Sequence, residues 1–240
     1  LASLANERDP YTLMVTGLVM VGAVETNAAE NRIEDTTPIA RLTEEPLVVV
    51  VPAASEYQTL QDLVDAIVAQ GQGVTITGGS AGGADHILAG LLLEEAGLSG
   101  ADITQKLNYV PNAGGGEAVS LLLGNNAAAG ISGVGEFAEY VESGDLRALA
   151  VSSEEAATLL PEVPTMTSEG FDVVYTNWRG LLAPGGISEA DAEGLTALVT
   201  SMHESGAWKD VLEERGWTDA FLTGAEFTSF VDENIVDVSG

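Results

Sequence analysis

Cysteine is absent from the 240 residues of the sequence. A catalytic thiol, a zinc site with thiolate ligands and a disulfide framework are therefore excluded. Histidine is scarce as well, with only His86 and His203, and no cluster of histidine and acidic residues has the spacing of metal ligands. We accordingly expect neither a metal ion nor another cofactor.

Basic residues are the second shortage. Eight lysines and arginines stand against 37 aspartates and glutamates, which gives a formal net charge of −29. Nucleic acid and anionic membrane surfaces are poor partners for such a chain, because phosphate binding needs clustered lysine and arginine. The acids are dispersed among apolar residues, which indicates a solvated acidic surface, and such a surface suits a saline or extracytoplasmic setting.

Long apolar runs are also missing. Hydrophobic residues make up 45% of the sequence, but no run of 18 apolar residues is free of charge, so no membrane-spanning helix is predicted. The stretch that starts at Leu1 has no initiator methionine, no basic region and no cleavage-site pattern. We therefore expect the numbering to begin inside a longer protein.

The sequence does contain an alternation of predicted strands and helices. Strands are expected at residues 11–16, 39–42, 47–51, 74–77, 107–110, 127–131 and 146–151, and helices at 59–70, 85–96, 117–123 and 136–141. Such an alternation with short glycine-rich turns predicts parallel sheets covered by helices on both faces. Beyond Pro164, short strands are expected at 173–175 and 180–183, followed by helices that begin near Ser188, pass through Trp208 and begin near Ala225.

Three glycine-rich loops occupy the same position in this alternation. Residues 78–86, 111–116 and 132–135 each link the carboxyl end of a strand to the amino end of a helix. A helix start carries free N–H groups and a partial positive charge, and glycine lets a ligand approach the backbone closely. The loops therefore suit a small anion held by N–H and hydroxyl groups, although each could also be only a tight turn.

Neither histidine nor serine supports catalysis in these loops. His86 lies near a helix start and is expected to be mostly neutral, as a donor to an anion or as an ordinary surface residue. Ser80 lacks the Gly-x-Ser-x-Gly surroundings of an activated nucleophile, and no lysine precedes a serine or threonine as in a phosphate-binding loop. We predict no catalytic residue.

Several longer stretches, in this order, resemble the solute-binding proteins of the tripartite tricarboxylate transporter family, the TctC or Bug group. They are GLVMVGA at 17–23, TPIARL at 37–42, GSAGGADH at 79–86, GGGEA at 114–118, SGVGEF at 132–137, LRALAVS at 146–152 and NWRG at 177–180. The resemblance implies an α/β, type II periplasmic-binding-protein fold, with two α/β domains, two crossover strands and a ligand cleft. Domain 1 would comprise residues 1–46 and 177–240, without its N-terminal part, and domain 2 would comprise residues 47–176.

The resemblance also implies a function without catalysis. The protein would be extracytoplasmic, in the periplasm or anchored at the cell surface, and would deliver a small carboxylate to the permease subunits of a membrane transporter. A tricarboxylate such as citrate is the first expectation, and a dicarboxylate binder, a ligand-sensing subunit of a signalling system and an α/β hydrolase are the alternatives. We expect a monomer whose domains close on the ligand about connections near Leu47 and Tyr175.

The motifs imply one set of ligand-binding residues. They are Gly17, Leu18, Val19, Ser80, Ala81, Gly82, Gly83, Asp85, His86, Gly114, Gly115, Gly116, Ser132, Gly133, Val134 and Arg179. Arg179 is the one base inside the Asn-Trp-Arg-Gly motif. It is expected either to bind a ligand carboxylate bidentately or, with slight preference, to pair with an acid across the domain interface.

Overall fold

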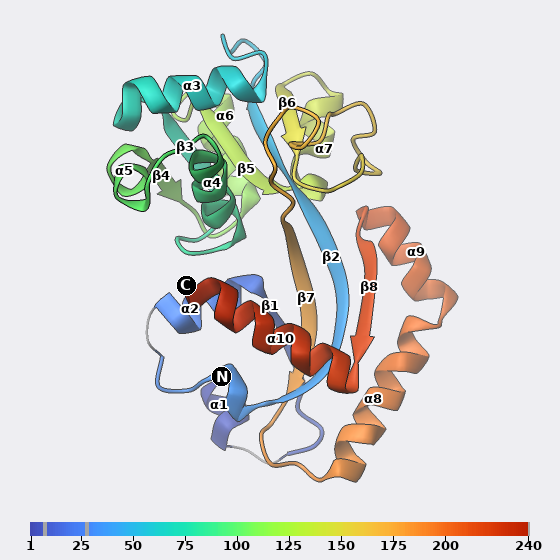
Figure 1. The fold of residues 1–240 in the computed structure, drawn as a ribbon. Coiled ribbons are helices and arrows are strands. Elements are labelled where there is room, and N and C mark those ends of the chain that lie inside the picture. Colours follow the sequence, from blue (N-terminus) through green and yellow to red (C-terminus); the bar gives the residue numbers. More distant parts are fainter. Residues whose placement is uncertain (7–8, 27–28, 240) are drawn as a thin grey trace. The chain divides into compact units, whose positions relative to one another are not determined.

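A computed structural model describes residues 1–6, 9–26 and 29–239 of the chain (Figure 1). Two compact units make up the chain: Leu1–Glu44 with Asn177–Gly240 form unit 1, and Glu45–Thr176 form unit 2. The predicted domain boundaries, after residues 46 and 176, lie close to the limits of these units. The predicted closure of the two domains on a ligand stays a prediction.

The sheet of unit 2 has the strand order β4–β3–β5–β2–β6. Its strands are the second half of β2 (Thr37–Pro52), β3 (Thr75–Gly78), β4 (Asn108–Pro111), β5 (Ala129–Gly133) and β6 (Leu146–Val151). The pairs β3–β4 and β3–β5 are parallel, as predicted, but β2 is antiparallel to β5 and to β6. The expectation of an all-parallel sheet is wrong for β2, because this strand enters unit 2 from unit 1 and does not follow a helix of the alternation.

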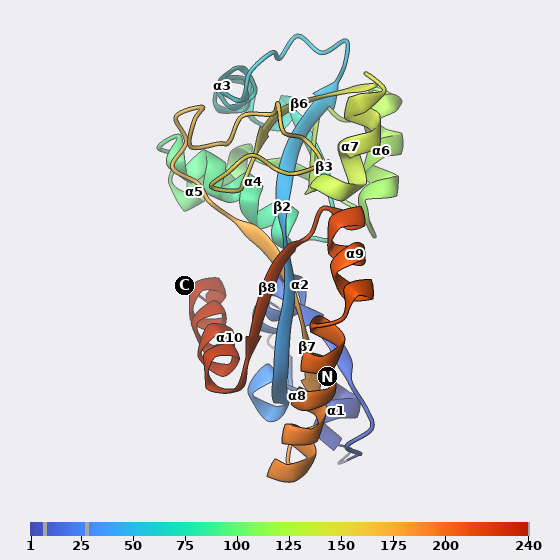
Figure 2. The same cartoon turned by 90° about the vertical axis from the view of Figure 1, so that its right-hand side faces the viewer.

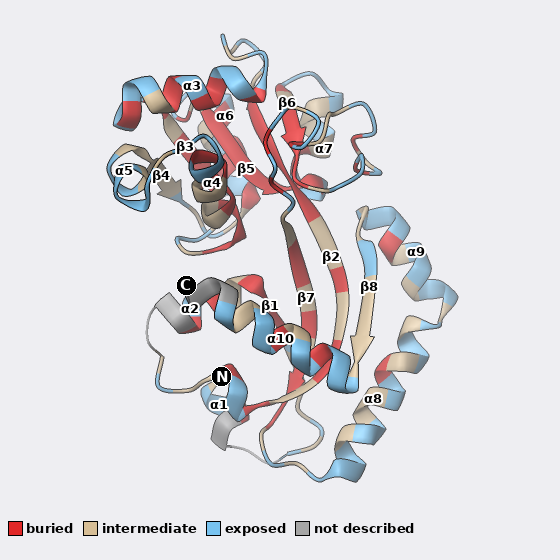
Figure 3. Cartoon of the chain, viewed as in Figure 1, coloured by how far each residue is buried: buried red, intermediate tan, exposed pale blue. Residues whose placement is uncertain are grey.

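Helices cover both faces of this sheet, which confirms the prediction. α3 (Leu60–Gln70), α4 (Ala84–Glu95) and α5 (Gly100–Lys106) lie on one face, and α6 (Gly115–Leu123) and α7 (Val134–Glu142) lie on the other (Figure 2). A short 3-10 helix, Gly71–Gly73, follows α3. Residues 47–51 of β2 are fully buried, as expected for an apolar run enclosed on both faces, while the outer sides of the helices are exposed (Figure 3).

Unit 1 contains the sheet β1–β7–β2–β8. Its elements are α1 (Ala2–Asn6), β1 (Met14–Gly17), α2 (Leu18–Thr26), a 3-10 turn (Ile33–Asp35), the first half of β2, β7 (Thr176–Ala183), α8 (Glu189–His203), α9 (Gly206–Arg215), β8 (Thr218–Thr223) and α10 (Gly224–Ser239). Val199 of α8 packs against Ile39 and Ala183 on one face of the strands. α10 contacts α2 and β8 on the other face (Figure 2).

Several sequence predictions differ from these elements. Residues 39–42 and 47–51 belong to a single strand, β2, which continues through 43–46. Residues 173–175 are not a strand, and β7 runs through the Asn-Trp-Arg-Gly motif because Arg179 pairs with Gly17 of β1. Local sequence could not give that pairing. α2 was not predicted, since its residues are apolar around most of the helix and show no helical period.

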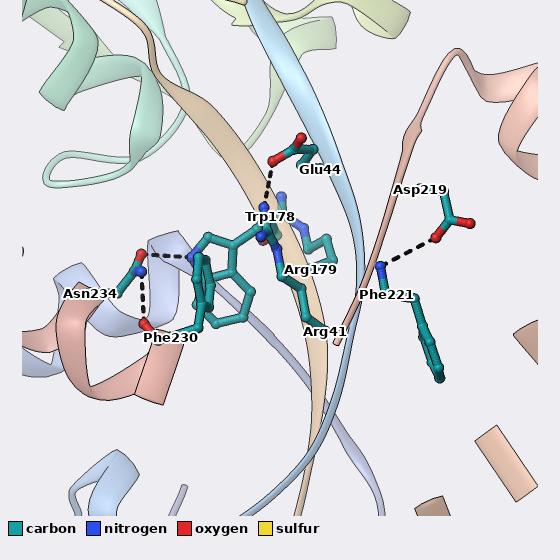
Figure 4. A network of polar contacts seen from close by, with 8 residues as sticks. All are labelled: Arg41, Glu44, Trp178, Arg179, Asp219, Phe221, Phe230 and Asn234. Atoms are coloured by element: carbon teal, nitrogen blue, oxygen red, sulfur yellow. Dashed lines mark hydrogen bonds and ion pairs between the residues drawn. The ribbon is translucent and has the colours of Figure 1, made fainter. Parts of the chain in front are cut away.

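The Asn-Trp-Arg-Gly motif places a tryptophan in the core of unit 1 (Figure 4). Trp178 is 2% exposed, and its indole N–H donates to Asn234 Oδ1 of α10 at 2.9 Å. The ring meets Phe227 and Phe230 edge-on, at centroid distances of 6.0 and 5.2 Å. This tryptophan therefore links β7 to α10 through a hydrogen bond and ring contacts.

No helix in the described ranges combines the length and apolar character needed to cross a membrane.

Candidate ligand-binding site

The three glycine-rich loops meet at one edge of the unit 2 sheet. β3, β4 and β5 run parallel, so their carboxyl ends share that edge. The backbone N–H of Asn112 donates to Gly78 O at 3.1 Å, and its side-chain amide donates to the same oxygen at 2.8 Å. A Cβ on Gly78 would lie 2.6 Å from Ile131 O of β5. The first loop therefore touches the segments that lead into the other two.

The first loop is a turn whose own groups satisfy several of its N–H donors. Gly79 N–H donates to Asp85 Oδ2 at 2.6 Å, and Gly82 N–H donates to His86 Nδ1 at 3.1 Å. Gly82 has φ +75°, whereas Gly83 is the N-cap of α4 with φ −82°. Of these two glycines, only Gly82 therefore needs the left-handed region of the backbone.

Ser80 and Ala81 form the exposed tip of this loop. Gly83 N–H donates to Ser80 O at 2.9 Å, so the tip is a hydrogen-bonded turn before the first residue of α4. The first N–H groups of a helix have no partner within the helix. The loop thus presents an accessible hydroxyl beside the start of α4.

His86 is held beneath the loop as a neutral ring. It stacks on Tyr109 with centroids 4.4 Å apart, and burial lowers the pKa of His86. Because Nδ1 accepts the Gly82 N–H, the proton of the neutral ring is on Nε2, which can donate. Burial therefore explains the neutral histidine that was expected from the helix dipole.

Two tyrosines surround Asp85, which is 9% exposed. Tyr109 Oη donates to Gly79 O at 3.0 Å. Burial and, to a smaller extent, the charge of Asp85 raise the pKa of both Tyr109 and Tyr175. Both phenols thus stay protonated at neutral pH. The carboxylate of Asp85 accepts a hydrogen bond from within the loop, from Gly79 N–H. Its role as a direct ligand contact stays a prediction.

The second loop leaves open space at the start of α6. No atom lies within 4 Å of the position that a Cβ would take on Gly114 or on Gly116. Gly115, between them, is buried and begins α6. Ala113 N–H donates to Glu117 Oε2 at 3.0 Å. The glycines therefore keep the backbone of this helix start accessible.

The third loop is the direct passage from β5 into α7. Ser132 is 4% exposed, and its hydroxyl donates to the carboxylate of Glu136. Gly135 N–H donates to Glu45 Oε1 at 3.0 Å, and a Cβ on Gly133 would lie 2.5 Å from the same oxygen. Val134 is 1% exposed and packs in the core of unit 2, so only its backbone belongs to the loop surface.

In unit 1 the structure brings the remaining predicted residues together at the end of β1. Gly17 pairs with Arg179, and a Cβ on Gly17 would lie 2.9 Å from Arg179 Nη1. Leu18 and Val19 follow as the first residues of α2. The guanidinium of Arg179 donates to Asn177 Oδ1 and, at 3.1 Å, to Trp178 O.

The ion pair across the domain interface that was slightly preferred for Arg179 stays a prediction. The salt bridges among the described residues join Arg32 to Glu34, Arg41 to Glu44 and His203 to Asp219, and none involves Arg179. Arg41 instead stacks over Phe230 at 4.2 Å and pairs with Glu44 (Figure 4). The local partners of Arg179 come from its own strand, since an extended strand places Asn177 on the same face two residues away.

Nearly the whole chain matches one protein family. A family model described as "Tripartite tricarboxylate transporter family receptor", TctC, covers residues 6–237. The chain belongs to this family. Its fold is accordingly the α/β, two-domain fold of the periplasmic solute-binding proteins, as the resemblance implied.

Individual relatives of this TctC family receptor are distant in sequence and close in fold. Protein BugT of Bordetella pertussis is 26% identical over 243 residues, which cover 98% of this chain and 71% of BugT. The other curated relatives are covered over 50% to 59% of their length. A TctC solute-binding protein from Polaromonas has a TM-score of 0.76 and 23% identity, covering 100% of this chain and 80% of its own. MatC from Rhodopseudomonas palustris with bound malate has a TM-score of 0.82 and 20% identity, and the match covers 98% of this chain and 81% of MatC.

Three acidic side chains at the loop edge were not predicted from the sequence. Glu45, Glu117 and Glu136 each accept a hydrogen bond from a loop group, beside the predicted Asp85. For Glu117 and Glu136, a glutamate in the first turn of a predicted helix was a usable clue. For Glu45 there was none, because it lies 90 positions from its partner Gly135.

Proposed function

We propose that this TctC family receptor is an extracytoplasmic solute-binding protein that captures a small carboxylate and delivers it to the permease of a tripartite tricarboxylate transporter, without catalysis. The observation that supports it most directly is the gathering of three helix starts, those of α4, α6 and α7, at one edge of unit 2. Membership of the receptor family supplies the transport context.

The chemistry of that edge suits a carboxylate. The starts of α4, α6 and α7 supply N–H groups with a partial positive charge, and Ser80 and Ser132 supply hydroxyls. Open space at Gly114 and Gly116 allows close approach to the backbone of α6. We propose that these groups, with the Nε2–H of His86, bind the ligand.

Arg179 offers a second kind of anion-binding group, in unit 1. Its guanidinium lies over Gly17, directly before the start of α2. A guanidinium beside a helix start is a favourable position for a carboxylate. We propose that Arg179 and the backbone of Gly17–Val19 take part in binding. The family description supports a tricarboxylate such as citrate, and the malate in MatC supports a dicarboxylate.

Calorimetric titration of citrate, malate and succinate tests the proposal, with Gly82→Val as the variant. A valine at φ +75° costs roughly 1–3 kcal/mol of backbone strain in the loop, which would lower affinity roughly five- to 150-fold if the loop binds the ligand. Gly144→Val is the matched control, because Gly144 also has a positive φ, +80°, with open space around it but follows α7.

Both valine variants are expected to melt at lower temperature, and only Gly82→Val is expected to bind more weakly. Equal affinity for the carboxylate in the two folded variants would show that the first loop is only a turn and does not bind the ligand. Failure of the unchanged protein to bind any of the three carboxylates would reject the proposed ligand class.

A further inference from the structure

The carboxylate of Glu136 lies where the second and third loops meet. It accepts the hydrogen bond of the Ser132 hydroxyl, and a Cβ on Gly115 would overlap its Oε2. Ser132 is 4% exposed, whereas Glu136 is an exposed residue in the first turn of α7. The carboxylate of one exposed side chain therefore lies beside both the buried Ser132 hydroxyl and Gly115, the first residue of α6.

The Ser132 hydroxyl and the start of α6 are among the groups that we propose bind a ligand carboxylate. The N–H groups at the start of α6 have no partner within the helix and carry its partial positive charge. The buried Ser132 hydroxyl is a donor already aimed at a carboxylate oxygen, that of Glu136. A ligand carboxylate and Glu136 thus require the same position.

The two carboxylates cannot share that position without a nearby cation. Unit 2 contains only two basic residues, Lys106 and Arg147. Lys106 Nζ donates to Val68 O, and Arg147 donates to Ala53 O at 2.9 Å and to Tyr57 O at 3.2 Å. Both bases are therefore engaged with backbone carbonyls away from the loop edge, so no lysine or arginine of unit 2 offsets the charge of Glu136 there, and we expect a ligand carboxylate to displace it.

We infer that Glu136 is a specificity-determining residue, which competes with the ligand carboxylate for Ser132 and the start of α6 and limits the negative charge that a ligand can bring. This inference rests on the proposed carboxylate-binding function. A displaced Glu136 stays tethered to α7, so its repulsion acts more strongly on a trianion than on a dianion. The receptor then favours a dicarboxylate over citrate.

Glu136→Gln tests the inference by calorimetric titration of malate and citrate. Loss of the competing charge should tighten malate binding roughly three- to 30-fold and citrate binding by a larger factor. Glu136→Ala, which leaves no acceptor for Ser132, should tighten binding at least as much. Glu139→Gln is the matched control, since it removes the same charge from an exposed position further along α7 and should leave both affinities within about twofold.

A second measurement separates competition from a merely structural role. Urea unfolding of Glu136→Gln without ligand should show equal or lower stability than the unchanged protein, because a contact of the folded chain is weakened. Lower stability together with tighter binding is expected only of a competitor.

The inference is overturned if Glu136→Gln and Glu136→Ala bind malate no tighter than the unchanged protein. It is also overturned if Glu139→Gln increases the affinity for malate as much, because the loss of one negative charge anywhere on α7 would then explain the effect. If the unchanged protein binds neither malate nor citrate, the proposed function fails first. If the unchanged protein binds malate or citrate and the Glu136 variants bind no tighter, only the role of Glu136 is rejected and the proposed function stands.

Discussion

Two neighbouring glycines at the start of α6 offer a direct test of the carboxylate placed against this helix. Gly115 and Gly116 occupy the first turn of α6, and neither has a positive φ angle. A Cβ on Gly116 would meet no atom within 4 Å, whereas a Cβ on Gly115 would overlap the carboxylate of Glu136. The substitutions Gly115→Ala and Gly116→Ala therefore differ in one contact.

The expected magnitudes follow from that difference. Alanine in place of glycine stabilises a helix by roughly 0.5–1 kcal/mol, and Gly116→Ala should gain up to that amount. Gly115→Ala receives the same gain but pushes Glu136 away from the Ser132 hydroxyl. A hydrogen bond to a charged acceptor contributes about 1.5–3 kcal/mol, and the exposed position of Glu136 argues for the lower end or less. Gly115→Ala should thus be less stable than Gly116→Ala by about 1 kcal/mol or more.

Equilibrium unfolding in urea measures both free energies, and a double-mutant cycle identifies the cause. In a Glu136→Gly background the methyl group at position 115 meets neither the carboxylate nor the Cβ of residue 136, which would otherwise lie 3.1 Å away, so the difference between the two alanine variants should largely disappear. The reasoning is refuted if both variants are equally stabilising in the unchanged background, or if their difference persists after Glu136 is removed.

The remaining predictions concern a histidine, a tryptophan and an arginine. Burial lowers the pKa of His86 below its ordinary 6.5, and NMR titration should show this lowered pKa. Stability should fall as the pH drops below about 6.5, because the unfolded chain takes up the proton first, and a His86 pKa at or above 6.5 would contradict the buried ring. Asn234→Ala should lower the free energy of unfolding by about 1–3 kcal/mol in urea denaturation, since the N–H of the buried Trp178 loses its acceptor, and unchanged stability would contradict that role. Arg179→Lys should weaken malate binding in calorimetry if the guanidinium binds a carboxylate bidentately, and unchanged affinity would leave Arg179 a purely structural residue.

Much of the fold could be predicted from the sequence because its elements carry local information. The period of apolar residues gave α3 to within a residue, and Gly71, with φ +56°, ends it where glycine is the residue that tolerates such a turn. Ser188 was predicted as a helix start, and its hydroxyl accepts the N–H of Asp191 at 3.1 Å. Elements without such a period, α2 above all, were missed.

The position of the three loops was likewise contained in the sequence. Each follows a strand and precedes a helix, and parallel strands bring their carboxyl ends to one edge. The composition of the loops, rich in glycine and free of lysine and arginine, also pointed to backbone N–H groups as the binding groups. That the loops bind a carboxylate stays a proposal.

Tertiary structure alone decided which side chains stand beside those N–H groups. Glu45 reaches Gly135 from 90 positions away because β2 lies next to β5 and antiparallel to it. The spacing of apolar residues along the sequence encodes neither this strand pairing nor its direction. Likewise, Glu136 meets Gly115 only because α6 and α7 start side by side on one face of the sheet. Hydrogen bonds and charge repulsion act over a few ångströms of space, whatever the separation along the chain, so the acids that surround the candidate site could be counted in the sequence but not placed.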